Sequence, residues 1–317
     1  MLPPDVPLPL APGATVGFVG LGRMGVPMSS RLAAAGYVVR GFDRDEDARS
    51  RFSAESGIAP VAALADAAHG SDVVILMLPS SPIVREVLLE DGLLDAVPAG
   101  ALLADMGSSE PMVTRELAEE ASRRGVRYLD APVSGGVRGA RDGTLTVMAG
   151  GHAADLDACR PLLGVLAAGV VHAGPAGAGH ALKALNNLLS ATSMLASSEA
   201  LLVGRRFGIE PETMLAAINS SSGRSYSTEY KLPTFVLPET YSSGFAAQLM
   251  VKDMRIAVGL AAATESPLAL GVTALELWEQ ALDALPSEAD HTEIARWVET
   301  LVRAPPPADA ALEGEAP

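Results

Sequence analysis

The first half of the chain alternates short apolar runs, rich in Val, Leu and Ile, with stretches whose apolar residues recur at helical spacing. A short apolar run bounded by Gly, Pro or Asp is typical of a buried strand, and the periodic stretches are typical of amphipathic helices. This order predicts an α/β fold with a doubly wound, mainly parallel sheet. We expect strands at residues 15–19, 38–42, 73–78, 101–104, 127–130, 144–149 and 170–172, and helices at residues 26–35, 83–89, 111–124 and 153–166.

The pattern changes after residue 179, where strand signals mostly stop and long Ala- and Leu-rich helical patterns begin. Glycines and a proline at 174–179 separate the strand-rich pattern from the helical pattern. We therefore expect a sheet domain at 15–176 and an all-α domain at 177–303, with a flexible leader at 1–14 and a disordered tail at 304–317. The expected helices of the second domain are 180–207, 211–220, 246–264, 268–284 and 292–302.

Composition narrows the class of partner. The net charge is −15, which argues against nucleic acid and anionic membranes, since both need clustered Lys and Arg. No stretch reads as a signal peptide or a membrane span, so we expect a cytoplasmic location. Cys159 is the only cysteine and the histidines show no metal-ligand spacing, so we expect no disulfide and no metal site. We interpret Cys159 as a packing residue.

A glycine-rich turn follows the first expected strand and opens the first expected helix. The first glycine of such a turn permits a tight bend, the second lets a pyrophosphate approach the backbone, and the third allows close helix packing. The pattern is weak alone, but its strand–turn–helix context predicts a Rossmann-type dinucleotide site. The turn consists of Gly20, Leu21, Gly22, Arg23, Met24 and Gly25.

The end of the second expected strand bears on which dinucleotide binds. Asp43 stands about 20 residues beyond the glycines, where a carboxylate would accept hydrogen bonds from the adenosine ribose and repel a 2′-phosphate. The next residue, Arg44, could stack on adenine or bind a 2′-phosphate, or it could be an exposed cation among acidic neighbours. We predict NAD as the cofactor, with NADP possible.

Lys183 is the only charged residue between Arg160 and Glu199, and it lies in an apolar helical pattern. Taking an ammonium out of water is costly, so burial lowers a lysine pKa toward the range useful for acid–base chemistry. Asn187 lies one turn further along the same face. The alternative is a lysine whose stem lies along apolar surface while its ammonium reaches water, and this segment alone leaves both interpretations open.

Motifs along nearly the whole chain, from about residue 15 to about residue 302, then point to one family. The chain resembles the β-hydroxyacid dehydrogenase family, the group of 3-hydroxyisobutyrate dehydrogenase and tartronate semialdehyde reductase. Besides the glycine turn, the motifs are Met-Leu-Pro-Ser at 77–80, Asp-Met-Gly-Ser-Ser at 105–109, Asp-Ala-Pro-Val-Ser-Gly-Gly at 130–136, Gly-Thr-Leu-Thr at 143–146, Gly-Ala-Gly-His at 177–180 running to Lys183 and Asn187, and Lys-Asp at 252–253.

The resemblance implies hydride transfer between a nicotinamide cofactor and a short β-hydroxy acid or semialdehyde, by a homodimer or homotetramer. Lys183 would be the general acid/base and Asn187 its positioning partner, and both would contact substrate. Lys252 would close the site over the nicotinamide, supported by Asp253. The alternative is that the two residues are an ordinary pair of opposite charges on a solvent-exposed helix surface. Ser134, Gly135 and Gly136 would bind the substrate carboxylate, or alternatively form only a glycine-rich turn after a strand. Leu78, Pro79 and Ser109 would line the cofactor site.

The chain also departs from the family pattern. His180 stands where glutamine is common, and the Gly-x-Gly-His-x-x-Lys run is similar to that of 6-phosphogluconate dehydrogenase, whose longer helical C-terminal half is missing here. Two alternatives remain open from sequence. One is an imine reductase, which has a similar fold but usually another residue at the position of Lys183. The other is a non-catalytic dinucleotide-binding module, which would be expected to lose Lys183 or the turn at 134–136.

Overall fold

The computed structural model describes residues 9–301. The predicted tail at 304–317, the last two residues of the predicted helical domain and the first eight residues of the predicted leader lie outside this range. The described chain divides into two compact units, one of residues 9–188 and 252–269 and one of residues 189–251 and 270–301. The predicted boundary at 176/177 divides the chain into two continuous segments, whereas each compact unit consists of two segments of the chain. The predicted boundary stays a prediction.

The first unit contains a mixed sheet in which five parallel strands are followed by an antiparallel extension. The strand order is β2-β1-β3-β4-β5-β7-β6, and β8 pairs with β7. The β1–β5 pairings are parallel, whereas β7 runs antiparallel to β5 and β6. The strands are β1 (Thr15–Val19), β2 (Val38–Phe42), β3 (Val73–Leu76), β4 (Leu102–Asp105), β5 (Arg127–Asp130), β6 (Val133–Ser134), β7 (Leu145–Gly151) and β8 (Ala167–Gly174).

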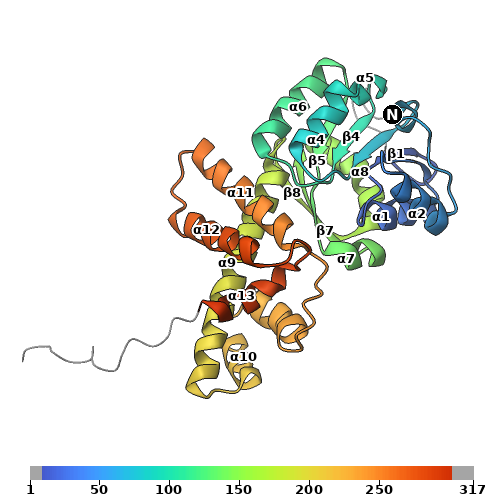
Figure 1. Cartoon of the computed structure of the whole chain (residues 1–317). Helices are drawn as coiled ribbons and strands as arrows, with labels where there is room; N and C mark the ends of the chain where they lie inside the picture. The colour runs from blue at the N-terminus through green and yellow to red at the C-terminus, as the bar shows by residue number, and fades with distance from the viewer. Residues whose placement is uncertain (1–8, 302–317) are drawn as a thin grey trace, which may run out of the picture. The chain divides into compact units, whose positions relative to one another are not determined.

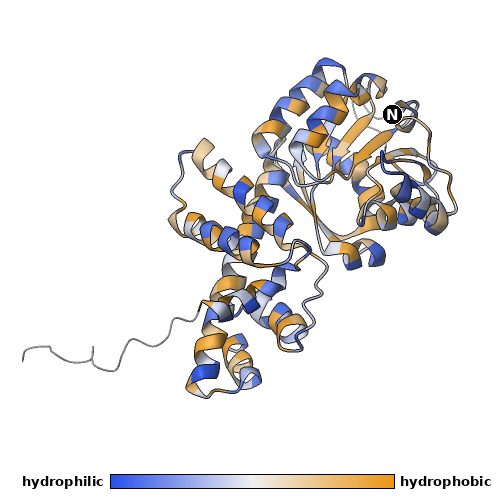
Figure 2. Cartoon of the chain, viewed as in Figure 1, coloured by the Kyte–Doolittle hydropathy of each residue, from blue (hydrophilic) through white to orange (hydrophobic). Residues whose placement is uncertain are grey.

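Helices cover both faces of this sheet, because its strands are apolar on both sides (Figures 1 and 2). In β3, Val73 and Ile75 pack into one core, and Val74 and Leu76 pack into the other. This alternation confirms the predicted doubly wound sheet. The helices of the first unit are α1 (Gly25–Ala34), α2 (Glu46–Ser56), α3 (Leu64–Ala68), α4 (Ser81–Arg85), η1 (Glu86–Glu90), α5 (Leu93–Ala96), α6 (Pro111–Arg123), α7 (Gly136–Asp142) and α8 (Ala153–Leu166).

The second unit is helical. Its buried side chains include Met194, Leu232, Trp278 and Ile294, and the indole Nε1 of Trp278 donates a hydrogen bond to the carbonyl of Ala191 at 3.2 Å. No helix within residues 9–301 is both long enough and apolar enough to cross a membrane. The remaining helices are α9 (Ala178–Phe207) and α11 (Ala247–Ala263), which each contribute to both units, and α10 (Pro211–Asn219), η2 (Ser227–Val236), α12 (Ala269–Ala284), η3 (His291–Glu293) and α13 (Ile294–Thr300).

The sequence pattern predicted elements with a clear apolar signal better than elements without one. The bounds of β1, β2, β5 and α8 agree with the prediction residue for residue, while β3 ends two residues earlier than expected. The prediction missed α2, where only Ala48 and Phe52 are buried, so that the apolar signal is weak. It also missed the two-residue β6, the glycine-containing α7, and η2, a π-helix that contains Pro233.

The start of α9 is fixed against the sheet by one carboxylate. Asp130, the last residue of β5, is fully buried, and its two oxygens accept hydrogen bonds from the backbone N–H groups of Gly177 and His180, at 2.8 and 2.9 Å. A carboxylate at this place satisfies N–H groups that have no partner within the helix and complements the positive end of the helix dipole. Gly179 allows the close approach, because a Cβ there would overlap the carbonyl oxygen of Met148.

We predict that Gly179→Ala lowers the free energy of unfolding by about 1–3 kcal/mol, since the added methyl group forces α9 away from β7. Gly164→Ala is the matched control. Gly164 also lies in a helix, but a Cβ added to it would meet no neighbouring atom within 4 Å, so alanine there should stabilise by about 0.4–1 kcal/mol. Denaturant unfolding followed by circular dichroism measures both changes. Equal stabilities of the two variants would contradict this account.

Candidate active site

The glycine turn lies at the carboxyl end of β1, where the chain leaves the sheet between two neighbouring strands. β1 pairs with β2 on one side and β3 on the other, which makes this the switch point at which open α/β sheets bind ligands. A Cβ at Gly20 would overlap the carbonyl oxygen of Met77, and one at Gly25 would overlap that of Gly20. The first and third glycines are therefore required by packing inside the unit.

The second glycine is different, because nothing lies within 4 Å of the place where its Cβ would be. Gly22 and Arg23 are exposed, no side chain caps the start of α1, and its first turn contains no acidic residue. An open backbone at an uncapped helix N-terminus suits a pyrophosphate, whose charge would meet the positive end of the helix. The turn therefore fits the phosphates of a dinucleotide.

Asp43 and Arg44 have separate environments. Asp43 Oδ2 accepts a hydrogen bond from the backbone N–H of Leu21 at 2.7 Å, which fixes the carboxylate beside the glycine turn. The exposed Arg44 guanidinium forms ion pairs with Glu86 and Asp91 at 3.1 and 2.9 Å. Asp43 therefore lies next to the glycine turn, as expected of a residue that binds the adenosine ribose. Arg44, in contrast, is paired with acidic side chains of the segment that follows β3.

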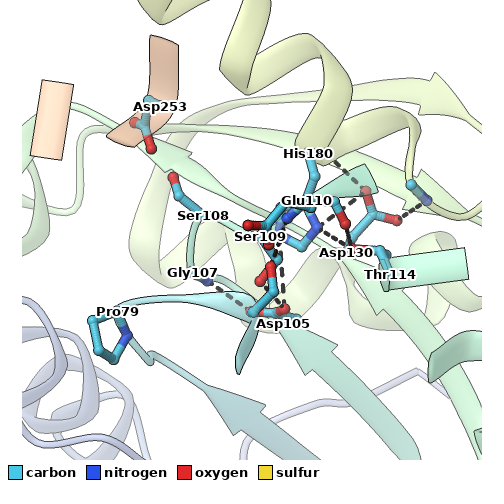
Figure 3. Close-up of polar contacts among 12 residues, drawn as sticks. Pro79, Asp105, Gly107, Ser108, Ser109, Glu110, Thr114, Asp130, His180 and Asp253 are labelled. Carbon is cyan, nitrogen blue, oxygen red and sulfur yellow. Dashed lines mark hydrogen bonds and ion pairs between the residues drawn. The ribbon is translucent and has the colours of Figure 1, made fainter. Parts of the chain in front are cut away.

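The loop after β4 is held by the buried carboxylate of Asp105 (Figure 3). Its Oδ1 accepts a hydrogen bond from the Gly107 N–H at 3.0 Å, and its Oδ2 accepts one from the Ser109 hydroxyl at 2.9 Å. The ammonium of Lys252 donates to the carbonyls of Ser108 and Pro79, both at 3.0 Å. Lys252 thus joins the loops after β3 and β4, the two segments predicted to line the cofactor. Leu78 in the first of them is partly buried.

The two predicted catalytic residues lie on one buried face of α9. Lys183 and Asn187 are 8% and 5% exposed. The Asn187 amide donates to Asp253 Oδ2 at 2.5 Å, and Asp253 Oδ1 lies 3.3 Å from the Lys252 ammonium. The structure therefore brings together Asn187, Asp253 and Lys252, three of the residues that the resemblance singles out.

The environment of Lys183 favours its neutral form. Desolvation by burial lowers the pKa of its ammonium, the nearby positive charge of Lys252 lowers it further, and the carboxylate of Asp253 acts in the opposite direction. Burial has the largest effect. The solvent-reaching interpretation of Lys183 fails on this point, because its side chain is enclosed. A lysine in such surroundings can accept or donate a proton nearer to neutral pH than an exposed one.

The predicted carboxylate-binding turn lies on the short strand β6 and the first residue of α7. Ser134 pairs with Thr146 of β7, and Gly135 and Gly136 have φ of +129° and +62°. These angles are rarely adopted by residues with a side chain, so both glycines are required by the backbone of the turn. Ser134 is partly buried, whereas Gly135 is exposed, which leaves donors near the surface of the unit.

Two residues with clear structural roles were quoted in motifs but given no role from sequence. They are Asp105, which orders the loop after β4, and Asp130, which caps α9. Both end short strands that are largely buried, and an acidic residue at the end of such a strand is the signal that could have found them. Cys159 is buried, which raises the pKa of its thiol to about 12, in agreement with its interpretation as a packing residue.

The glycine turn at the switch point, the Asp43 carboxylate beside it and the buried Lys183 are the features expected of a nicotinamide-dependent oxidoreductase. Comparison with known families agrees. Residues 15–174 match the NAD binding domain of 6-phosphogluconate dehydrogenase, and residues 177–298 match the domain described as NAD-binding of NADP-dependent 3-hydroxyisobutyrate dehydrogenase.

Individual relatives cover most of the chain. It is 38% identical to the 2-(hydroxymethyl)glutarate dehydrogenase of Eubacterium barkeri, over 83% of this chain and 88% of that protein. It is also 38% identical to the NAD-dependent L-serine dehydrogenase of Pseudomonas aeruginosa, over 89% and 96%. The structure of Mycobacterium tuberculosis 3-hydroxyisobutyrate dehydrogenase with L-serine superposes with a TM-score of 0.85 at 33% identity, covering 90% of this chain and 99% of that one. The chain therefore belongs to the β-hydroxyacid dehydrogenase family.

Proposed function

We propose that this protein transfers a hydride between NAD and the primary alcohol of a short 3-hydroxy carboxylic acid, which becomes the semialdehyde. The names of the similar proteins support this substrate class, because 2-(hydroxymethyl)glutarate, 3-hydroxyisobutyrate and L-serine all carry a CH₂OH group on the carbon next to a carboxylate. The observation that carries the proposal is the buried Lys183, on the helix face where Asn187 and Asp253 connect to the loops after β3 and β4.

In the oxidation direction, the neutral amine of Lys183 takes the proton of the substrate hydroxyl as the C–H bond breaks and the C=O bond forms. A nicotinamide bound at the switch point would accept the hydride with its two electrons. In reduction, the Lys183 ammonium returns the proton to the forming alkoxide. Acid–base assistance of this kind typically contributes about 10²–10⁴-fold in rate.

Three further groups complete the proposed site. The turn of Ser134, Gly135 and Gly136 holds the substrate carboxylate through its hydroxyl and backbone N–H groups, which suit close contact with an anion. Asn187 contacts the substrate hydroxyl, with its amide oriented by Asp253. NAD is favoured over NADP because Asp43 would repel a 2′-phosphate and Arg44 is already paired with Glu86 and Asp91.

We expect Lys183→Ala and the closer-sized Lys183→Met to abolish turnover, because both remove the group that exchanges the proton. NADH binding, followed by its fluorescence, should stay within about threefold of wild type, because the chemical role is separate from dinucleotide affinity. Steady-state oxidation of 3-hydroxyisobutyrate, L-serine and 2-(hydroxymethyl)glutarate measures the turnover. Substantial turnover by either folded variant would remove Lys183 from this role.

The pH profile of oxidation should report the surroundings of Lys183. Oxidation requires the neutral amine, so kcat/KM should rise as pH increases through the lysine pKa. The negative charge of Asp253 raises that pKa, so Asp253→Asn should lower it and move the rising limb to lower pH. Asparagine keeps an oxygen for the Asn187 amide, which limits the loss of geometry. A limb displaced to higher pH would contradict the assignment.

We further propose that the protein is a homo-oligomer that associates through α9. Leu182, Leu185 and Leu189 lie on one stripe of this helix and are 38%, 40% and 72% exposed. An apolar stripe of this kind favours association, since burying it removes apolar surface from water. The predicted cytoplasmic location stays a prediction.

Sedimentation velocity should therefore find a dimer or tetramer, and Leu189→Glu should shift the population toward smaller species by placing a charge in the contact. Val38→Glu is the matched control, because Val38 is also exposed, at 51%, but lies on the edge strand β2. A wild-type protein that sediments as a monomer at micromolar concentration would exclude the association.

A further inference from the structure

A closed series of contacts begins and ends on the catalytic face of α9. His180 faces Asp105, whose carboxylate holds the loop of residues 107–109. From that loop the series returns through Lys252 and Asp253 to the amide of Asn187. Because residues three and four apart share a helix face, His180 and Asn187 lie one turn before and one turn after Lys183. All these residues belong to the first unit.

His180 is the least explained member of this series. Its imidazole is fully enclosed, with Nδ1 2.7 Å from the hydroxyl of Thr114 in α6. Its Nε2 is buried without a hydrogen-bond partner and lies 3.8 Å from Asp105 Oδ2 (Figure 3). A buried polar atom without a hydrogen-bond partner costs free energy, so its position needs an explanation. The explanation depends on which nitrogen of the His180 ring carries the proton.

The hydroxyl of Thr114 has one proton and two neighbouring acceptor sites, the carbonyl of Glu110 at 3.2 Å and Nδ1 of His180. If it donates to Nδ1, the neutral ring carries its proton on Nε2. If it donates to Glu110, Nδ1–H points at the hydroxyl, and a neutral ring would turn a bare lone pair toward the Asp105 carboxylate. Nδ1 also lies 3.9 Å from Asp130 Oδ2, but the Thr114 hydroxyl can donate a proton to it. Nε2 has no such donor beside it, so a proton on Nε2 avoids the repulsion and an N–H faces Asp105.

We propose that His180 is a positioning residue of the dehydrogenase. Its Nε2–H, 3.8 Å from the Asp105 carboxylate, favours by electrostatic attraction the orientation in which Asp105 binds the Gly107 N–H and the Ser109 hydroxyl, and so orders the loop after β4 relative to Lys183. The distance between Lys183 and the cofactor-lining loop is thereby set from both sides, by His180 through Asp105 and by Asn187 through Asp253 and Lys252. The catalytic part of this inference rests on the proposed function, whereas the ordering of the loop does not.

The test compares two amides of different reach. His180→Gln places its amide nitrogen near the position of Nε2 and keeps a donor toward Asp105, whereas His180→Asn ends near the position of Nδ1 and keeps only the contact with Thr114. His172→Asn is the control, because the ring of His172 contacts the carbonyl of Gly151 in the β7–β8 region, outside the series.

We expect kcat of His180→Gln to stay within about threefold of wild type and kcat of His180→Asn to fall at least about tenfold, because small misplacements of reacting groups are costly. The deuterium isotope effect on oxidation of a C3-deuterated hydroxy acid should increase in His180→Asn, as hydride transfer becomes slower. NADH affinity should change less than kcat. Equal kcat and equal isotope effects in folded Gln and Asn variants would overturn the catalytic role.

Hydrogen–deuterium exchange of the backbone amides at 106–109 provides a measure that needs no turnover. Exchange in this loop should be faster in His180→Asn than in His180→Gln, wild type or the His172→Asn control. Equal loop exchange in the two His180 variants would overturn the inference even if the protein proved to have another substrate. Conversely, faster loop exchange together with an active Lys183→Ala variant would sustain His180 as the loop-ordering residue and reject the proposed acid–base chemistry.

Discussion

The arrangement of the first unit depends on the contact between the Asp130 carboxylate and the first turn of α9. A sheet strand ends in an acidic residue, and its two oxygens satisfy N–H groups that the helix cannot satisfy internally. Glycine at 150 and 179 lets the two backbones approach, since a Cβ at either position would meet the carboxylate. The helix therefore starts at a fixed point, and the face that carries Lys183 and Asn187 is fixed with it.

The same unit reconciles two opposing demands on Lys183. Burial disfavours its charge, which suits the acid–base role proposed for it, but an uncompensated buried ammonium would be destabilising whenever it is protonated. Asp253 offsets that cost, and its own charge is shared with Lys252 and with the amide of Asn187. Lys183 and the loops after β3 and β4 are thus parts of one electrostatic arrangement.

Much of the fold could be predicted from local pattern. The strands β1 and β5 are largely buried apolar runs, β2 alternates between buried and more exposed residues, and α8 buries residues at helical spacing, so local pattern predicted their bounds. Elements without such a signal were missed. The two residues of β6 are a strand only because β7 pairs with them, and η2 is a π-helix, whose hydrogen-bond spacing does not match the 3.6-residue apolar period of an α-helix.

The sequence by itself determined the α/β class, the dinucleotide turn at residues 20–25 and the unusual position of Lys183 among apolar neighbours, because each is a local pattern of spacing or burial. The tertiary structure decided which groups surround that lysine. Lys252 is 173 residues from Pro79 and 144 from Ser108, and Asp130 is 50 residues from His180. Contacts at such separations leave no periodic trace in a sequence, since they arise only when the sheet brings the carboxyl ends of its strands to one edge.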